Sequence, residues 1–310
     1  MAPHRPTQPI PILVNREGGT AASAGPDLED TIRQACTEVG ITAEVQLLDG
    51  AEMTAAVEAR KHHPLIVVGG GDGTLGQAAG ALIAAGSSAV LGILPLGTHN
   101  HLALQLGIPK DIAGAIRTLA EGEERRIDVG TVNDLVFLNN ASIGLYPLLV
   151  RSREAGRRRH GMPKWLANLF AGAAVMRRLR HHRLRVEIAG SAETIRTPLL
   201  FVGNNVYSLE RGQIGQRAAL DEGKLSVFAV ATNTRLSVIW FALRALVGRT
   251  DAEKDFAALQ TCRDFTVNAH AADIHVALDG ELHQLRTPLR FESKPGALRV
   301  MVPREDAANS

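Results

Sequence analysis

The first 130 residues alternate between short apolar runs and helix-like stretches, and this rhythm restricts the chain to few folds. Four runs are predicted as strands and three intervening patterns as helices: strands at 11–15, 41–48, 65–68 and 89–94, and helices at 26–40, 51–61 and 74–85. Strands that alternate with helices pair in parallel and carry helices on both faces of the sheet. We therefore expect an α/β domain with a parallel sheet over residues 1–124.

The pattern changes after residue 124, where short strand-like segments follow one another mostly without intervening helices. Examples are "RRIDVGTV", "LVFLNNASIG", "KLSVFAV" and "IHVALDGE", interrupted by two helical patterns at 163–181 and 234–248. This texture predicts a β-rich, antiparallel second domain over residues 125–310. Its final strand can return toward the first domain.

Composition favours a globular cytoplasmic protein. The chain is 45% hydrophobic and 21% charged, and its N-terminal apolar patch is short and broken by proline, unlike a signal peptide. Cys36 and Cys262 lie far apart and form neither a metal-binding spacing nor a disulfide framework. We interpret both as packing residues.

The segment "PLIVVGGGDGTLGQAAG", residues 64–80, leads from an apolar strand through a glycine turn into a helix. The backbone amides of such a turn, together with the N-terminus of the next helix, attract an anion. Phosphate is the expected ligand. A purely structural turn that needs positive φ is the plainer alternative.

Two other nucleotide motifs fit this turn less well. Gly71, Gly73 and Gly76 match the dinucleotide pattern, but no acidic residue for the ribose occurs between Asp72 and Asp111. No glycine loop is followed by the Gly-Lys-Ser/Thr of a P-loop, and the protein-kinase triplets are missing.

Asp72 lies in the middle of the turn and indicates a metal-assisted site. A carboxylate about 4 Å from a phosphate charge would be repelled by roughly 4 kcal/mol at an effective dielectric of 20. A bound Mg²⁺ reverses the sign of this interaction. We therefore expect a nucleoside triphosphate site, in which Thr74 begins the helix and donates to a phosphate oxygen.

Several motifs occur in a fixed order along nearly the whole chain, from about residue 10 to 303: "GGGDGTL", "LGILPLGTHNHLALQLGIP", "RRIDVGTVN", "NNASIGLYP", "AALDEGKLSV", "ALDGELH" and "PGALRVMVP". This series resembles the diacylglycerol kinase catalytic-domain family, which includes bacterial lipid kinases and the sphingosine and ceramide kinases. The resemblance implies an ATP site between an α/β domain and a β-rich domain. The residues it implies for nucleotide binding are Asn15, Gly19, Thr20, Gly70, Gly71, Asp72, Gly73, Thr74, Leu75, Gly76, Gln77, Thr98 and Asn100.

The resemblance also implies the catalytic residues. Asp128 would join Asp72 in positioning the catalytic Mg²⁺ through water, and Glu281, with Asp279 beside it, would take the proton from the acceptor hydroxyl. Two acids separated by one residue in a short strand face the same side. Taken alone, "DGE" is equally typical of a hairpin turn.

A second, structural Mg²⁺ site is implied at Ala219, Glu222 and Lys224. Glu222 stands where the family usually has Asp, and His101 replaces the acid of the usual Gly-Thr-Gly-Asn-Asp loop. Gly76 and Gln77 also stand where Asn and Glu are usual. These departures leave open a second hypothesis, a nucleotide- or lipid-binding regulatory protein without catalysis.

The positive charge is concentrated in one segment. Residues 151–185 carry a formal charge of +10, although the whole chain carries only +2. A helix at 163–181 with arginines at both ends could lie on an anionic bilayer or pack into the core with a solvated basic flank. Few aromatic residues interleave the basic run, which argues against a nucleic-acid partner.

The leading hypothesis is an ATP- and Mg²⁺-dependent lipid kinase that phosphorylates a hydroxyl of diacylglycerol or a related lipid. We expect it to be cytoplasmic and to meet this lipid peripherally at the membrane surface; a homodimer is an assembly that the sequence leaves open. An NAD kinase shares the Gly-Gly-Asp-Gly-Thr turn but should lack the "DGE" ending and the basic amphipathic helix.

Overall fold

The computed structural model describes residues 8–17, 19, 21, 27–144, 182–207, 217, 219–230 and 256–304. The chain divides into two compact units: residues 1–129 with 295–310, and residues 130–294. Both helical patterns predicted for the second half, at 163–181 and 234–248, lie outside the described residues.

The first unit contains a parallel sheet with the strand order β2-β1-β3-β4-β16. Its strands are β1 (Ile10–Asn15), β2 (Ala43–Leu48), β3 (Leu65–Gly70), β4 (Val90–Pro95) and the second half of β16 (Leu289–Val302). Every residue of β4 is buried, and β1 and β3 are buried over five of their six residues. Such continuous apolar runs are what a sheet covered on both faces requires.

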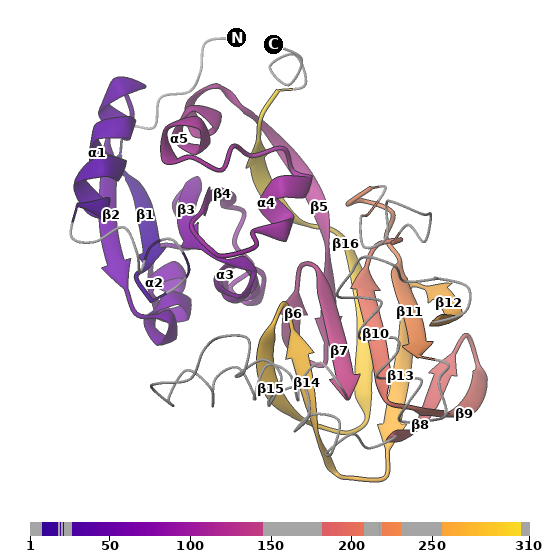
Figure 1. The fold of residues 1–310 in the computed structure, drawn as a ribbon. Helices are drawn as coiled ribbons and strands as arrows, with labels where there is room; N and C mark the ends of the chain where they lie inside the picture. The colour runs from indigo at the N-terminus through magenta and orange to yellow at the C-terminus, as the bar shows by residue number, and fades with distance from the viewer. Residues whose placement is uncertain are drawn as a thin grey trace, which may run out of the picture. The chain divides into compact units, whose positions relative to one another are not determined.

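Helices flank this sheet in two pairs (Figure 1). The helices are α1 (Leu28–Glu38), α2 (Met53–Ala59) after the 3-10 turn Gly50–Glu52, α3 (Asp72–Ala84), α4 (His101–Gln105) and α5 (Ile112–Glu121). Helix α1 packs beside α5, and α2 packs beside α3. In α1 the buried residues are Leu28, Ile32, Ala35 and Cys36, the spacing of one apolar helix face.

The second unit is a β-sandwich. One sheet has the order β12-β11-β10-β7-β14-β15, and the other contains β13, β8 and β9 beside the first half of β16, with β5 and β6 attached. The strands are β5 (Glu123–Val132), β6 (Leu135–Phe137), β7 (Asn140–Gly144), β8 (His182–Ile188), β9 (Ser191–Thr197), β10 (Leu199–Asn204), β11 (Leu225–Val230), β12 (Phe256–Cys262), β13 (Asp264–Ala269), β14 (Asp273–Leu278) and β15 (Glu281–Arg286).

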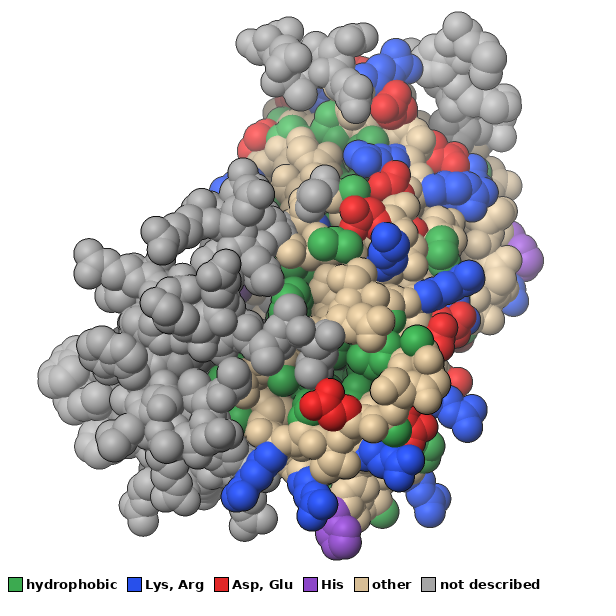
Figure 2. Space-filling model, turned by 90° about the vertical axis from the view of Figure 1, so that its right-hand side faces the viewer, with side chains coloured by type: hydrophobic (Ala, Val, Ile, Leu, Met, Phe, Trp, Pro, Cys, Tyr) green, Lys and Arg blue, Asp and Glu red, His purple; other side chains and the backbone are tan. Residues whose placement is uncertain are grey.

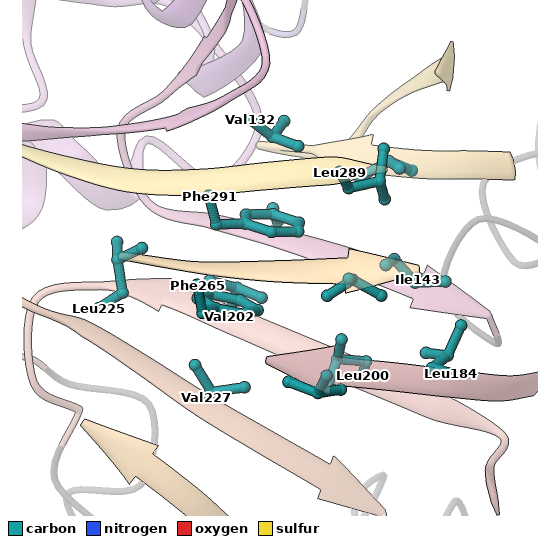
Figure 3. Close-up of a cluster of buried hydrophobic side chains, with 14 of the residues drawn as sticks. Val132, Ile143, Leu184, Leu200, Val202, Leu225, Val227, Phe265, Leu289 and Phe291 are labelled. Atoms are coloured by element: carbon teal, nitrogen blue, oxygen red, sulfur yellow. The ribbon is translucent and has the colours of Figure 1, made fainter. Parts of the chain in front are cut away.

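Alternate residues of both sheets form one apolar core between the layers (Figure 3). Phe265 stacks on Phe291 with ring centroids 4.7 Å apart, and Phe137 meets Phe291 edge to face at 6.5 Å. Val202 and Val227 contribute from the opposite sheet. Each fully buried side chain of this size stabilises the fold by about 1.5–3 kcal/mol.

These observations confirm the predicted fold class, an α/β domain with a parallel sheet followed by an antiparallel β-rich domain. The sequence pattern missed the hairpin strand β9, whose residues are mostly exposed and polar, and the short helix α4. Neither segment has the apolar periodicity on which the predictions depend. Helix α5 was also missed, although it buries Ala115, Ile116 and Leu119 on one face.

Both cysteines are free thiols, with Cys36 buried and Cys262 half-buried. Burial raises the pKa of each thiol to about 11. Because the thiolate is the reactive form, both are unreactive packing residues near neutral pH. Among the described residues, no helix combines the length and the apolarity needed to span a bilayer.

An ion pair connects β5 to the returning half of β16 within the first unit. The Arg299 guanidinium donates to both carboxylate oxygens of Glu124 and also to the Ser88 carbonyl. The hydrogen bond from Arg299 lowers the pKa of the Glu124 carboxyl. A lowered folded-state pKa stabilises the fold above the pKa of the unfolded chain, and the contribution disappears as pH falls through the folded-state pKa.

We expect Glu124→Gln to lower the free energy of unfolding by about 0.5 kcal/mol at pH 7, the usual contribution of a partly exposed pair. The difference between the two proteins should shrink as pH falls through the folded-state pKa of Glu124, because the wild-type carboxyl then becomes protonated. Urea unfolding at a series of decreasing pH values measures this change, with the exposed neighbour Glu123→Gln as control. A Glu124→Gln difference that stays the same as pH falls would contradict this account.

Candidate functional site

The candidate site of the first unit lies at the carboxyl ends of β1, β3 and β4. The chain runs from β1 outward to β2, then returns to place β3 on the other side of β1, followed by β4. The order of strands therefore reverses between β1 and β3, and open α/β sheets bind ligands at the carboxyl edge of such a switch point.

Three glycine loops pack against one another at this edge. A Cβ atom on Gly97, after β4, would lie 2.2 Å from Gly71 Cα, after β3. A Cβ atom on Gly19, after β1, would lie 2.6 Å from the Gly97 carbonyl carbon, and Gly19 has a positive φ of 51°. The loops thus meet backbone to backbone, and their amides lie where a phosphate chain can approach closely.

Gly69, Gly70 and Gly71 of the "GGGDGT" motif are required for space rather than for positive φ. Gly71 is the extended N-cap of α3, with φ −91°, and a Cβ atom on Gly70 would lie 2.7 Å from Thr74 Cβ. The plainer alternative, a turn that needs positive φ, is wrong for these positions. Close approach of neighbouring backbone and side chains explains them instead.

Helix α3 begins at Asp72, two residues before the predicted start, because Gly71 already accepts the first intrahelical bond from the Leu75 amide at 3.0 Å. The amides of the first turn therefore point toward the glycine loops. Asn15, the last residue of β1, donates its side-chain amide to Thr74 Oγ1 at 3.0 Å. This bond joins two of the predicted nucleotide-binding residues across the switch point.

The remaining predicted residues of this segment lie inside α3 or in the strand before it. Gly70 is the buried last residue of β3, and Gly73 and Gln77 are half-buried within α3. Leu75 and Gly76 are buried. Thr20 lies outside the described residues.

Asp72 links α3 to α4. Its Oδ2 accepts the His101 amide and its Oδ1 accepts the Leu102 amide, each at 3.0 Å. Hydrogen bonds from two backbone amides stabilise a carboxylate, so the charge of Asp72 has structural support in addition to any metal. The sequence gives no sign of this link, because it joins residues 29 and 30 positions apart.

Asn100 shapes the loop after β4 from within. It is buried in a left-handed conformation, with φ 52°. Its Oδ1 accepts the Gly97 amide at 2.9 Å, and its Nδ2 donates to the carbonyls of Pro95 and Gly97. Thr98 is exposed on the same loop. The loop therefore presents Thr98 and His99 outward, while Asn100 holds its shape.

The replacement of the usual acid by His101 brings two imidazoles together. His99 and His101 are exposed, and their rings stack with centroids 5.7 Å apart and planes 16° apart. Asp128 lies in β5 and is 2% exposed, and its Oδ1 accepts the Gly296 amide of β16 at 2.8 Å. Asp128 is thus fixed in the first unit by the returning strand.

In the second unit, Asp279 and Gly280 form the two-residue turn between β14 and β15, with φ of 47° and 93°. Glu281 is the first residue of β15 and is half-buried. The expectation that both acids share one strand is therefore wrong, because only Glu281 is in a strand. Two successive positive φ values are the signature of a tight hairpin turn.

The residues predicted for a structural Mg²⁺ site lie next to the end of β10. Glu222 Oε2 accepts the Val206 amide at 3.2 Å, and the Lys224 carbonyl accepts the Asn205 amide at 2.8 Å. Ala219 is half-buried in the same segment. One carboxylate and two carbonyls form an oxygen-only set, which suits Mg²⁺. Within the described part of the chain, no cluster of three His, Cys, Asp or Glu side chains is placed to hold a metal.

Comparison with known proteins agrees with this architecture. The family described as "Diacylglycerol kinase catalytic domain" matches residues 9–132, and the "YegS C-terminal NAD kinase beta sandwich-like domain" matches residues 150–302. A solved structure titled as a diacylglycerol kinase from Bacillus anthracis str. Sterne superimposes with a TM-score of 0.66 at 19% identity, covering 95% of this chain and 96% of that one.

Curated relatives extend the similarity. A "Probable lipid kinase YegS-like" of Pseudomonas savastanoi pv. phaseolicola is 31% identical over 78% of this chain and 76% of its own length. A "Diacylglycerol kinase" of Staphylococcus aureus (strain JH9) is 27% identical over 66% of this chain and 64% of its own length.

The paired domains define the class of protein: a kinase-type α/β unit with a diacylglycerol kinase catalytic domain, combined with a β-sandwich. Within that class, the chain belongs to the YegS-like lipid kinase family.

Proposed function

We propose that this protein is an ATP- and Mg²⁺-dependent kinase that phosphorylates a hydroxyl of diacylglycerol or a related lipid. The observation that carries the proposal is the backbone packing of the three glycine loops at Gly19, Gly71 and Gly97, on the switch point of the sheet. A side chain on any of the three would press against the backbone of a neighbouring loop and push the loops apart.

The residues of the first unit would bind and orient the triphosphate. Amides of the first turn of α3 would donate to phosphate oxygens, and the Thr74 hydroxyl, held by Asn15, would donate to another. Thr98 would add a contact from the loop after β4. Bound Mg²⁺ would neutralise the charge that develops on the phosphates, with Asp72 and Asp128 holding it through water.

Glu281 would act in the second unit as the general base. A lipid hydroxyl is a poor nucleophile, and a carboxylate within hydrogen-bond reach raises the rate by about 10²–10⁴. Its carboxylate would accept the hydroxyl proton while the oxygen attacks the γ-phosphorus in line with the departing ADP. The turn before Glu281 fixes where this strand begins.

The substrate would be met at the membrane surface. The described part of the face in Figure 2 carries basic and acidic side chains interspersed. The strongly basic segment at 151–185 lies outside the described residues except for its last four. We assign the membrane contact to that segment because its charge of +10 attracts anionic lipids.

Transfer of labelled phosphate from γ-labelled ATP tests the proposal directly. The lipid acceptors are diacylglycerol, sphingosine, ceramide and phosphatidylglycerol in mixed micelles. NAD⁺ is tested alongside them as a soluble alternative acceptor. We expect label in at least one lipid, and its loss on addition of EDTA. Label in NADP⁺ alone would identify an NAD kinase, and ATP binding with every lipid unlabelled would identify a binding protein without catalysis.

A further inference from the structure

A three-residue link, Leu138–Asn140, leads from the end of β6 to the first residue of β7 in the second unit. Charged side chains hold it from two sides. The anionic side is Asp279, in the turn just before Glu281. Its Oδ2 accepts the Leu138 amide at 2.7 Å, and its Oδ1 accepts the amides of Asn139 and Asn140 at 2.8 and 3.0 Å. The Asp279 amide in turn donates to the Asn140 carbonyl at 2.9 Å.

The cationic side is Arg217. Its Nη1 donates to the Leu138 carbonyl at 2.7 Å and to the Asn204 carbonyl at 3.2 Å, and its Nη2 donates to Asn139 Oδ1 at 2.8 Å. The Tyr207 hydroxyl donates to the Asn139 carbonyl at 2.9 Å, and the Arg217 guanidinium lies 5.8 Å from the centre of the Tyr207 ring. The contacts of Arg217 therefore span the link and the end of β10.

One peptide group lies between the two charges. The Leu138 carbonyl and the Asn139 amide belong to the same peptide unit, and they bond Arg217 and Asp279 respectively. Charged partners at both ends of a peptide strengthen each other's hydrogen bonds, because each polarises the group that the other contacts. Loss of either Arg217 or Asp279 therefore weakens the hydrogen bond that the other makes to this peptide group.

This arrangement determines where β15 begins. Asp279 is a non-glycine residue at φ 47°, a conformation that persists only where its surroundings hold it. The four bonds between the turn and the link hold it there, and Glu281 follows two residues later. The Asp279 carboxylate accepts three amides, so its chemistry is that of an anchor rather than of a base.

We propose that Arg217 and Asp279 are positioning residues for Glu281, acting through the link Leu138–Asn140. The inference rests on the proposed function, since it assigns Glu281 the role of base. No sequence motif indicates Arg217. For Asp279 the resemblance implied a catalytic role, and the proposal replaces it with the role of an anchor.

Two conservative variants test the proposal. Arg217→Lys keeps the charge but cannot donate to two acceptors in the fixed planar geometry of a guanidinium. Asp279→Asn keeps one acceptor oxygen for Asn139 and Asn140 but turns an NH₂ toward the Leu138 amide, donor against donor. The matched controls are Arg196→Lys, exposed on β9, and Asp273→Asn, exposed at the other end of the same hairpin.

We expect each test variant to lower kcat for lipid phosphorylation by about 10²-fold, the usual effect of misplacing a catalytic group by 1 Å. The KM for ATP and the half-saturating Mg²⁺ concentration should stay within about twofold of wild type, because neither variant alters the first unit. The acidic limb of the kcat–pH profile reports the ionisation of the base and should shift in both test variants. It should stay in place in both controls.

The same substitutions in a Glu281→Gln background separate positioning from general stability. If Arg217 and Asp279 act through Glu281, they should cause no further loss of rate once that carboxylate is gone. A further loss of the same size in that background would overturn the proposal. Test variants with wild-type kcat and an unshifted acidic limb would also overturn the proposal. A tenfold rise in the Mg²⁺ requirement of Asp279→Asn would overturn it too, because it would make Asp279 a metal ligand.

Tyr207→Phe provides a milder third variant if Arg217→Lys and Asp279→Asn fail to fold. It removes only the hydroxyl bond to the Asn139 carbonyl and keeps the ring that packs on Phe201. A severalfold fall in kcat with the same shift of the acidic limb supports the proposal, and wild-type behaviour overturns it. A wild-type protein that labels no lipid would defeat the proposed function itself, a result distinct from an active wild type with unaffected variants.

Discussion

We expect the Glu281→Gln variant to fold, to bind ATP and to phosphorylate lipid at about one-hundredth of the wild-type rate or less. This is the expected result because glutamine keeps the size of the side chain at the start of β15 but cannot take a proton, and a general base contributes about 10²–10⁴ in rate. Initial rates of labelled-phosphate transfer measure turnover, and calorimetry measures ATP binding.

Asp273→Asn, on the same hairpin, is the control for this measurement and should retain wild-type turnover. A Glu281→Gln protein with the wild-type rate would remove Glu281 from the role of base. A variant that also failed to bind ATP would show that the substitution disturbs more than proton transfer.

Gly97→Ala should abolish ATP binding and lower the melting temperature. Its Cβ atom would lie 2.2 Å from Gly71 Cα and 2.6 Å from Asn100 Oδ1. Real Cβ atoms do not approach so closely, and both neighbours are fixed, Gly71 by the start of α3 and Asn100 by its hydrogen bonds. The loops after β3 and β4 must therefore separate, at a cost of several kcal/mol, above the typical overpacking cost of about 1–3 kcal/mol.

Gly50→Ala is the matched control, since its Cβ atom would make only ordinary contacts, the shortest of them 3.4 Å to Asn15 Nδ2. It should bind ATP and melt close to the wild type, as calorimetry and thermal unfolding would show. If Gly97→Ala bound ATP as the wild type does, the nucleotide would have to lie away from the three glycine loops.

The sequence was sufficient to predict the parallel sheet and the β-rich second half, because both depend on local periodicity. Continuous apolar runs of five or six residues mark β1, β3 and β4, and a strand followed by a glycine turn and a helix defines the edge where ligands bind. These features require no knowledge of distant contacts.

Other parts of the site depend on bonds between side chains and distant backbone, which no local pattern encodes. Asp72 holds amides 29 and 30 residues away, and Asp279 holds amides 139 to 141 residues away. The sequence analysis therefore identified both acids but predicted only catalytic or metal-positioning roles for them, and not their structural hydrogen bonds. Arg217 was missed because a single arginine carries no motif, and two of its partners are backbone carbonyls distant in the sequence.

The division of β16 between the two units has a consequence for synthesis on the ribosome. Val300, which follows the second unit in the sequence, pairs with Leu91 of β4, and Gly296 supplies the amide that holds Asp128. The N-terminal unit therefore cannot complete its sheet until residues beyond 295 have left the exit tunnel, although its other four strands emerge first. The first unit therefore completes its fold only after the whole of the second unit, residues 130–294, has been synthesised.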